Sequence, residues 1–221
     1  MARPLSPHDG GRGSEGTRPG EVRAHPNGFT LLELLAVVAI IAVLAALVLG
    51  ATAGAGERTR RARAGAELAV LAQALEAYRA QFGDYPRTGA APNLPAGPAA
   101  ADDGPGILFN ALTGRRGPSA VLQPIEARVL VPLASCVLAS DALPTAGSTA
   151  QRANAFVDPW AQRYLYWYKT GASWSAPTPV LLSAGPDGLV ELPAESADWD
   201  GTPPAGAGAN ADNLAAFGPS S

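Results

Sequence analysis

The sequence predicts an α+β fold in which a long amino-terminal helix packs on a small three-stranded antiparallel sheet, like the stem and head of a lollipop. Three observations predict it: residues 29–49 are almost continuously apolar, residues 57–82 carry one apolar stripe at helical spacing, and the β-type segments come only after residue 150. Helical segments followed by strands, without alternation, are typical of α+β proteins.

Residues 1–28 contain too few large apolar side chains to bury a core, so we expect a leader that is removed. The run at 29–49, FTLLELLAVVAIIAVLAALVL, would form a helix of roughly 32 Å, enough to cross a membrane. Its single charge, Glu33, either reaches the lipid headgroups or meets a cation. Cleavage after Gly28 would create such a cation, the amino group of Phe29, on a neighbouring subunit.

The string GFTLLELL resembles the class III signal of type IV pilins and of type II secretion pseudopilins. This resemblance implies that a prepilin peptidase cuts after Gly28, that the new amino terminus becomes an N-methylated Phe29, and that Glu33 acts in assembly. The fold it implies is the pilin-like one, with 29–49 as a transmembrane and assembly helix.

Three later strings are similar in order and spacing to the carboxyl-terminal half of the major pseudopilin of type II secretion: DPWAQRYLYW (158–167), LLSAGPDG (181–188) and ADNLAAF (211–217). Two residues depart from that pattern. Ala161 stands where Gly is usual, and Gly50 stands where Pro often breaks the helix.

We expect residues 50–82 to continue the stem as an amphipathic helix, with a weak point at 50–56 where three glycines lower helix propensity. Glu57 and Arg61 form a well-oriented i,i+4 pair. The helix should end at Gly83. One apolar stripe should face the head: Leu68, Leu71, Leu75, Tyr78 and Phe82.

Residues 83–150 read as a variable loop region with a short helix at 107–112. Residues 151–221 should hold the sheet and a carboxyl-terminal calcium-loop region. Its predicted strands are 164–169, 180–183 and 189–191, the last two joined by a tight turn at 185–188. The Asp158-Pro159 turn should aim Trp160 into the core.

Acidic residues on Gly-rich loops offer the hard oxygen ligands that Ca²⁺ takes. The pseudopilin resemblance implies a Ca²⁺ site with Asp187 and Asp212 as carboxylate ligands, beside Ser183, Ala184 and Asn210. Asp198 and Asp200 are weaker candidates, because Ala209 occupies the last ligand position of an EF-hand that would begin at Asp198. The alternative is that these acids are solvated turn residues.

Composition argues against an enzyme. Both histidines, His8 and His25, lie in the leader, so the mature chain lacks Ser-His and Cys-His catalysis and imidazole ligands. The single cysteine, Cys136, can form no intrachain disulfide, and its apolar surroundings predict a buried, inert thiol. Without the leader the chain has 12 basic and 16 acidic residues, which gives no footprint for nucleic acid.

The resemblance implies a structural subunit of the type II secretion pseudopilus, a periplasmic filament that helps export folded proteins. The precursor would cross the bacterial inner membrane once, with its carboxyl-terminal domain in the periplasm, and then stack with copies of itself and minor pseudopilins on an inner-membrane assembly platform. Basic residues after the span would by charge alone favour the opposite orientation. Two alternatives are a minor pilin of a type IV pilus or DNA-uptake system and a single-span anchored binding domain.

Overall fold

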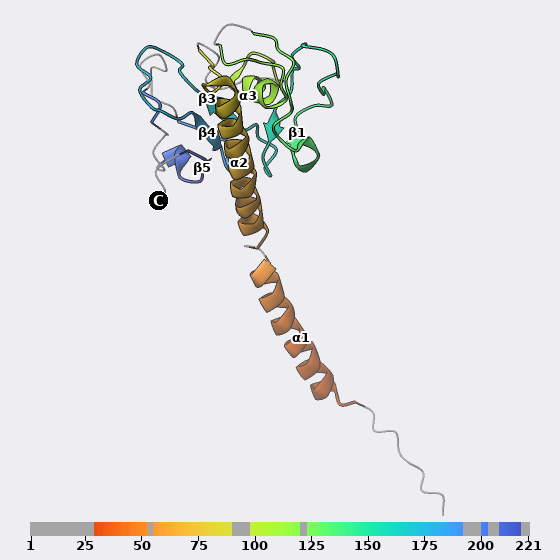
Figure 1. The fold of residues 1–221 in the computed structure, drawn as a ribbon. Helices are drawn as coiled ribbons and strands as arrows, with labels where there is room; N and C mark the ends of the chain where they lie inside the picture. The colour runs from red at the N-terminus through yellow and green to blue at the C-terminus, as the bar shows by residue number, and fades with distance from the viewer. Residues whose placement is uncertain are drawn as a thin grey trace, which may run out of the picture. The chain divides into compact units, whose positions relative to one another are not determined.

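The computed structural model describes residues 29–52, 55–89, 98–119, 123–191, 200–202 and 208–217 (Figure 1). The chain divides into two compact units, residues 1–49 and residues 50–221. Most of helix α1 (Leu31–Thr52) belongs to the first unit. The second unit holds helices α2 (Ala55–Phe82) and α3 (Gly104–Leu112) and two small antiparallel sheets, so the predicted α+β class is confirmed.

Helix α1 carries the apolar run for which the sequence predicts a membrane span at 29–49. Within the described part of the chain, no helix combines the length and the apolar character needed to cross a membrane.

Helix α2 presents the predicted stripe to the head. Leu68, Leu71, Leu75 and Tyr78 are buried, and Phe82 packs against the same cluster. The helix ends at Phe82, and Gly83 follows with φ +82°, a backbone conformation that favours glycine at a helix end. Arg61 Nε lies 3.2 Å from Glu57 Oε1, which confirms the predicted pair. The expected weak point at 50–56 includes residues 53 and 54, which lie outside the described residues.

The main sheet has the order β3-β4-β5 and is antiparallel throughout, in agreement with the predicted three-stranded sheet. Its strands are β3 (Leu165–Trp167), β4 (Val180–Ser183) and β5 (Leu214–Ala215). Strand β3 lies inside the predicted segment 164–169, and β4 has the predicted bounds. Leu165 pairs with Leu182, which in turn pairs with Ala215.

The prediction of a third strand at 189–191 is wrong, because β5 occupies that place beside β4. The Asn210 amide explains the difference. It accepts a hydrogen bond from the backbone N–H of Glu191 at 2.9 Å and donates one to the Glu191 carbonyl at 3.0 Å. A side chain therefore satisfies backbone groups of Glu191 that a strand would pair with a neighbouring strand.

Helix α3 begins three residues before the predicted 107–112. Asp103 caps it, since its Oδ1 accepts a hydrogen bond from Gly106 N–H at 2.7 Å, and Pro105 lies in the first turn. The same carboxylate pairs with Arg163 at 2.8 Å through Oδ2. Nearby, the η1 turn (Leu133–Ser135) precedes strand β1 (Val137–Leu138), which pairs with β2 (Phe156–Val157). This second sheet has no counterpart in the sequence prediction.

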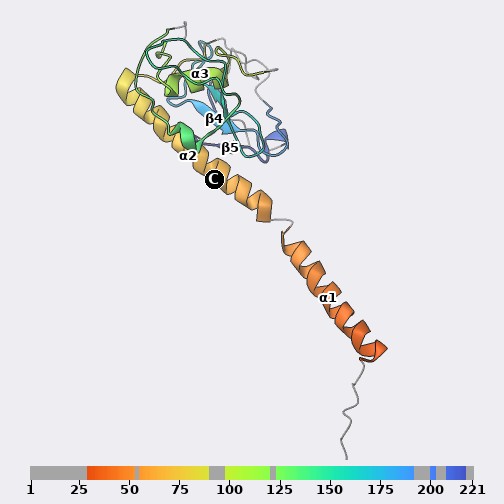
Figure 2. The same cartoon turned by 90° about the vertical axis from the view of Figure 1, so that its right-hand side faces the viewer.

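The core lies between α2, α3 and the sheet. Helix α2 contacts β4, β5 and α3, while α3 contacts β3; Figure 2 shows α2 passing beside β4 and β5. Alternate residues of β3 serve two clusters. Tyr166 packs on the helical side with Leu71 and Phe109. On the other side, Leu165 and Trp167 pack with Val180, so both faces of this strand are buried, as its apolar alternation predicts.

Trp160 does not enter the core. It is half-buried, and its indole Nε1 donates a hydrogen bond to Glu57 Oε2 on α2 at 3.1 Å. An indole has an apolar body and one polar N–H, so a position at the edge of the core with a carboxylate partner satisfies both. The prediction that the Asp158-Pro159 turn aims this side chain into the core is therefore wrong.

Candidate processing and assembly site

The start of α1 is organised by two side chains, Thr30 and Glu33. Glu33 Oε2 accepts hydrogen bonds from the backbone N–H of Thr30 at 2.9 Å and from its hydroxyl at 3.0 Å. In return, Thr30 Oγ1 accepts a hydrogen bond from Glu33 N–H at 3.2 Å. This reciprocal pattern is a capping box, which satisfies backbone donors that a helix amino terminus leaves unpaired.

The capping box gives Glu33 a role that the sequence prediction missed. The signal was present, since Thr followed three residues later by Glu, just before an apolar run, is the pattern of a capping box. Gly28, the predicted cleavage position, lies outside the described residues. Phe29, directly before Thr30, is 83 % exposed.

The described part of α1 exposes large apolar side chains on every side. Leu31, Leu35, Ile40 and Leu44 are all more than half exposed. A helix that is apolar all round needs an apolar environment, because water disfavours so large an apolar surface. This helix is therefore built to be covered by lipid or by other protein.

A comparison with protein-family profiles matches residues 23–49 to the prokaryotic N-terminal methylation motif. The chain carries a type IV pilin-like signal. Such a signal indicates a membrane-anchored prepilin, processed by a prepilin peptidase and assembled into pilus-like filaments. It does not separate type II pseudopilins from other type IV pilins. No curated protein and no solved structure gives a significant match to the chain.

The matched signal contains Gly28, Phe29 and Glu33, the three positions predicted to serve processing and assembly. Thr30 lies between them and fixes the Glu33 carboxylate next to the end that processing would expose. The predicted cleavage position, the predicted new amino terminus and the Glu33 carboxylate thus lie within six consecutive residues of the matched signal.

The predicted calcium ligands lie in the second unit, where two of them come together. Asp212 Oδ2 is 3.5 Å from the backbone N–H of Asp187. Gly185 makes this approach possible, since a Cβ built on it would lie 2.8 Å from Asp212 Oδ2. Asp187 itself accepts a hydrogen bond from Leu189 N–H at 2.8 Å. The two carboxylates thus occupy adjoining loops.

The other candidate ligands use their side chains elsewhere. Ser183 donates its hydroxyl hydrogen bond to Asp158, and Asn210 binds the backbone of Glu191. Ala184, which is buried, can offer only its carbonyl. Asp198 lies outside the described residues, and Asp200 accepts a hydrogen bond from Thr202 N–H at 2.8 Å. The described residues include no group of three or more acidic, His or Cys side chains placed to hold a metal.

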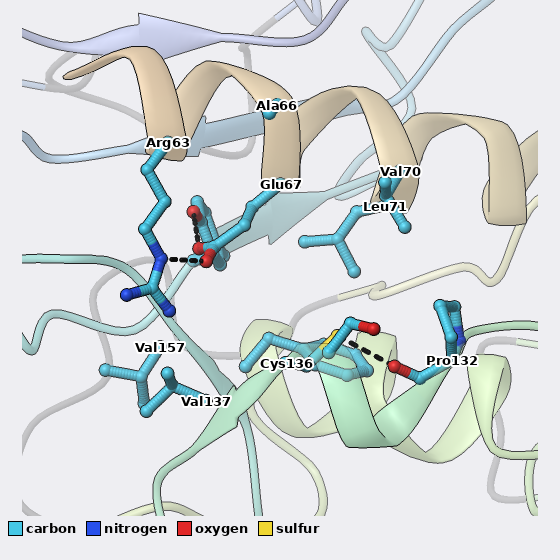
Figure 3. Close-up of a pocket in the computed structure, with 12 residues that line it drawn as sticks. Arg63, Ala66, Glu67, Val70, Leu71, Pro132, Cys136, Val137 and Val157 are labelled. Atoms are coloured by element: carbon cyan, nitrogen blue, oxygen red, sulfur yellow. Dashed lines mark hydrogen bonds and ion pairs between the residues drawn. The ribbon is translucent and has the colours of Figure 1, made fainter. Parts of the chain in front are cut away.

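Cys136 lies in an apolar pocket between α2 and the β1–β2 sheet (Figure 3). The pocket measures about 220 Å³, and its polar end holds Glu67, which accepts hydrogen bonds from Arg63 and from the Tyr164 hydroxyl, both at 2.7 Å. The thiol is half-buried, and burial raises its pKa above the usual value. A raised pKa favours the unreactive thiol form at neutral pH.

Proposed function

We propose that this protein is a structural subunit of the type II secretion pseudopilus. One observation carries the proposal. Helix α1 is apolar and exposed, and Glu33 is held at its amino-terminal end, a few residues after the cleavage position expected in the pilin-like signal. The precursor inserts into the bacterial inner membrane with its carboxyl-terminal domain in the periplasm. A prepilin peptidase then removes residues 1–28 and methylates Phe29, and the subunit acts mechanically rather than as an enzyme.

Assembly follows from the chemistry of α1. Packing of apolar helices against one another covers the side chains that one subunit leaves exposed. Glu33 then exchanges part of its capping box for the positive amino group of Phe29 on a neighbouring subunit. A carboxylate and an ammonium attract each other strongly in an apolar environment, and either group left there without its partner costs free energy. The pair therefore fixes the register of the filament.

The three strings that resemble a major pseudopilin support a type II pseudopilin rather than another type IV pilin, because residues of the different strings contact one another. Asp158 Oδ1 accepts hydrogen bonds from the backbone N–H groups of Trp160 and Gln162 at 3.0 and 2.9 Å. Its Oδ2 accepts one from Ser183, which belongs to the second string. Asp212 of the third string packs on Gly185 of the second.

Ala161 fits the same interpretation. Its φ is +67°, a left-handed conformation that glycine adopts at little cost. Glycine is the usual residue at this position in the pseudopilin pattern, because it adopts a positive φ easily. Ala161 has the same positive φ, so the backbone conformation fits the pattern although the residue differs.

We further propose that the adjoining loops of Asp187 and Asp212 bind one Ca²⁺. Two carboxylates supply charge, and backbone carbonyls such as that of Ala184, together with water, can complete a shell of six to eight oxygens. The Ala184 carbonyl also lies next to Asn213. In the alternative orientation of its side-chain amide, Asn213 donates a hydrogen bond to Ala184 O at 3.0 Å. Metal binding would have to displace that bond.

Amino-terminal mass spectrometry of the membrane-derived protein tests the processing step. The expected result is a mature chain that begins at N-methylated Phe29, and Gly28→Leu should leave the leader in place because the peptidase needs a small residue there. A chain that keeps its leader in cells with an active prepilin peptidase would support a simple single-span anchor instead.

Deletion of the gene tests whether the protein is a type II pseudopilin or a minor pilin. A pseudopilin mutant should lose secretion of folded proteins and keep pilus-dependent motility and DNA uptake. The reverse pattern would support a minor pilin of a type IV pilus or DNA-uptake system.

A further inference from the structure

Arg115 and Arg152 are charged groups without an acidic partner in the described part of the chain. The ion pairs there involve Arg61, Arg63, Arg79, Arg87, Arg163 and Lys169. Arg115 is only 6 % exposed and Arg152 is half-buried. A guanidinium does not lose its proton in proteins, and buried charges normally have a counter-charge. Two such cations together therefore require an explanation.

The two guanidinium groups converge on one residue, Thr145. Arg115 Nη2 donates to the Thr145 carbonyl at 3.1 Å, and Arg152 Nη2 donates to Thr145 Oγ1 at 2.6 Å. Arg115 Nη1 donates to the Gly114 carbonyl at 3.2 Å. The Nε atoms of both arginines are buried and have no hydrogen-bond partner. These acceptors are neutral, so none of them compensates the two charges.

The backbone around both arginines is fixed in advance. Asn110 on α3 is fully buried, accepts a hydrogen bond from Arg152 N–H at 2.7 Å and donates one to the Arg152 carbonyl at 2.9 Å. Gln151 donates to the Arg115 carbonyl at 3.3 Å. The two cations are therefore held close together by the fold itself, which is the preorganisation that a binding site needs.

Two other charged side chains lie near this segment, one basic and one acidic. Arg116 is 3 % exposed, and its Nη1 donates to Gln151 Oε1 at 3.4 Å, which brings a third guanidinium to the same segment. Glu126 is an exposed acid on the nearby loop, but its Oε1 accepts a hydrogen bond from Gly147 N–H at 3.0 Å. Among the described ion pairs, Glu126 joins neither Arg115 nor Arg152.

We propose that Arg115 and Arg152 bind one tetrahedral oxyanion, phosphate or sulfate, beside Thr145. Each guanidinium has five N–H donors; Arg115 uses two of them and Arg152 one in bonds to the protein. Arginine is the preferred side chain for phosphate-type groups because its planar fork makes two charge-assisted hydrogen bonds. A tetrahedral anion can turn separate oxygens toward two forks that come from different segments. The anion is either free in solution or the headgroup of a phospholipid.

Isothermal titration of the full chain in nonionic detergent tests the site. The titrants are sodium phosphate and sodium sulfate, at constant ionic strength in a chloride buffer. One saturable site is expected for the parent protein. Arg152→Gln and Arg115→Gln should each weaken binding at least tenfold. Arg58→Gln removes an exposed charge from α2 and should leave the affinity unchanged.

Three further measurements keep the result decisive. Circular dichroism checks that each variant is folded, and if Arg115→Gln is not, Arg152→Gln decides alone, because its side chain is only half-buried and Asn110 binds only its backbone. Short-chain phosphatidylglycerol, titrated as a monomer, separates a headgroup from free phosphate: tighter binding of the lipid identifies the headgroup as the source. Acetate should bind more than tenfold more weakly. Binding of none of the phosphate-type titrants, equal binding of acetate, or undiminished binding by folded Arg152→Gln would overturn the site.

Discussion

The Glu33 carboxylate is bonded to Thr30 in a single subunit, since it accepts hydrogen bonds from the backbone N–H and the hydroxyl of that residue at 2.9 and 3.0 Å. The proposed intersubunit pair with the amino group of Phe29 must therefore compete with, or build on, an existing local arrangement. Thr30 holds the carboxylate at the helix end where the new amine would appear. Assembly would then need a change of partner for Glu33 rather than a movement of the whole side chain.

Substitutions at these two positions should affect assembly to different degrees. Glu33→Ala removes the charge that sets register, so filament formation in a pseudopilus overproduction assay should fail or fall severely, while membrane insertion is kept because an acid is costly there. Thr30→Ala removes one cap, which costs about 1 kcal/mol at a helix start, and keeps the charge. It should reduce assembly less than Glu33→Ala does. A Glu33→Ala protein that assembles like the parent would refute the register role.

Asp84 provides a test of stability against pH. Burial alone would raise the pKa of this carboxyl, but hydrogen bonds from Lys169, Arg87 and Tyr168 outweigh burial and hold the pKa well below the usual range. An unfolded Asp has a pKa of about 3.9, so the native state keeps this carboxylate charged at a pH where the unfolded chain binds a proton. The network should stabilise fully above about pH 5 and progressively less as pH falls.

Asp84→Asn should therefore lower the free energy of unfolding at pH 7 by about 1.5–3 kcal/mol, the range for hydrogen bonds to a charged group. The difference from the parent should shrink as the pH approaches 2. Chemical denaturation at several pH values measures it. Asp141→Asn, at an exposed loop residue, is the control and should differ little from the parent at any pH. A constant difference between Asp84→Asn and the parent from pH 7 to pH 2 would contradict the argument.

The sequence predicted those parts of the fold that depend on long, regular patterns. Leu68, Leu71 and Leu75 repeat at helical spacing over several turns, and they are buried as expected. The position of β4 followed from an apolar run bounded by turn residues. Such signals add over many residues, so no single contact can reverse them.

The errors concern places where one side chain decides the structure. The segment 189–191 has the composition of a strand, but the Asn210 amide, about twenty residues later, takes the backbone groups of Glu191. Trp160 donates a hydrogen bond to Glu57, about a hundred residues earlier in the chain. Strands of two residues, such as β1 and β2, carry no detectable period. Sequence patterns report average burial, and they do not report a hydrogen bond between distant residues.

The candidate site divides in the same way. Gly28, Phe29 and Glu33 could be identified because the signal is a local string, whereas the grouping of Asp158 with Ser183 needs the folded sheet. Arg115 and Arg152 both donate to Thr145, and Asn110 on α3 holds the backbone of Arg152. No spacing in the sequence indicates that contact.

Ala161 gives a prediction that depends on backbone conformation alone. A residue with a Cβ at φ +67° is strained by roughly 1–2 kcal/mol, and glycine is not, although glycine costs more entropy on folding. Ala161→Gly should therefore stabilise the protein by about 0.5–1 kcal/mol, measured by denaturant unfolding. Ala153→Gly, at an exposed residue without positive φ, is the matched control and should destabilise it slightly. Destabilisation by both changes would show that the positive φ of Ala161 does not lower the free energy of unfolding of the parent protein.

Calcium binding is the prediction that tests the second candidate site. Asp187 and Asp212 lie on adjoining loops, and a bound cation would relieve the repulsion between their carboxylates and tie 208–213 to the turn after β4. Extracytoplasmic modules bind Ca²⁺ at about 10⁻⁴–10⁻³ M, and a ligand at about 100 times its Kd adds roughly 2.7 kcal/mol to stability. The melting temperature should therefore rise clearly in Ca²⁺ relative to chelator and much less in Mg²⁺. Asp187→Ala and Asp212→Ala should each abolish the rise. Asp200→Ala, whose carboxylate caps Thr202 instead, should keep it. Equal melting temperatures in Ca²⁺ and in chelator would show that these acids are solvated turn residues, and the filament role proposed for α1 would be unaffected.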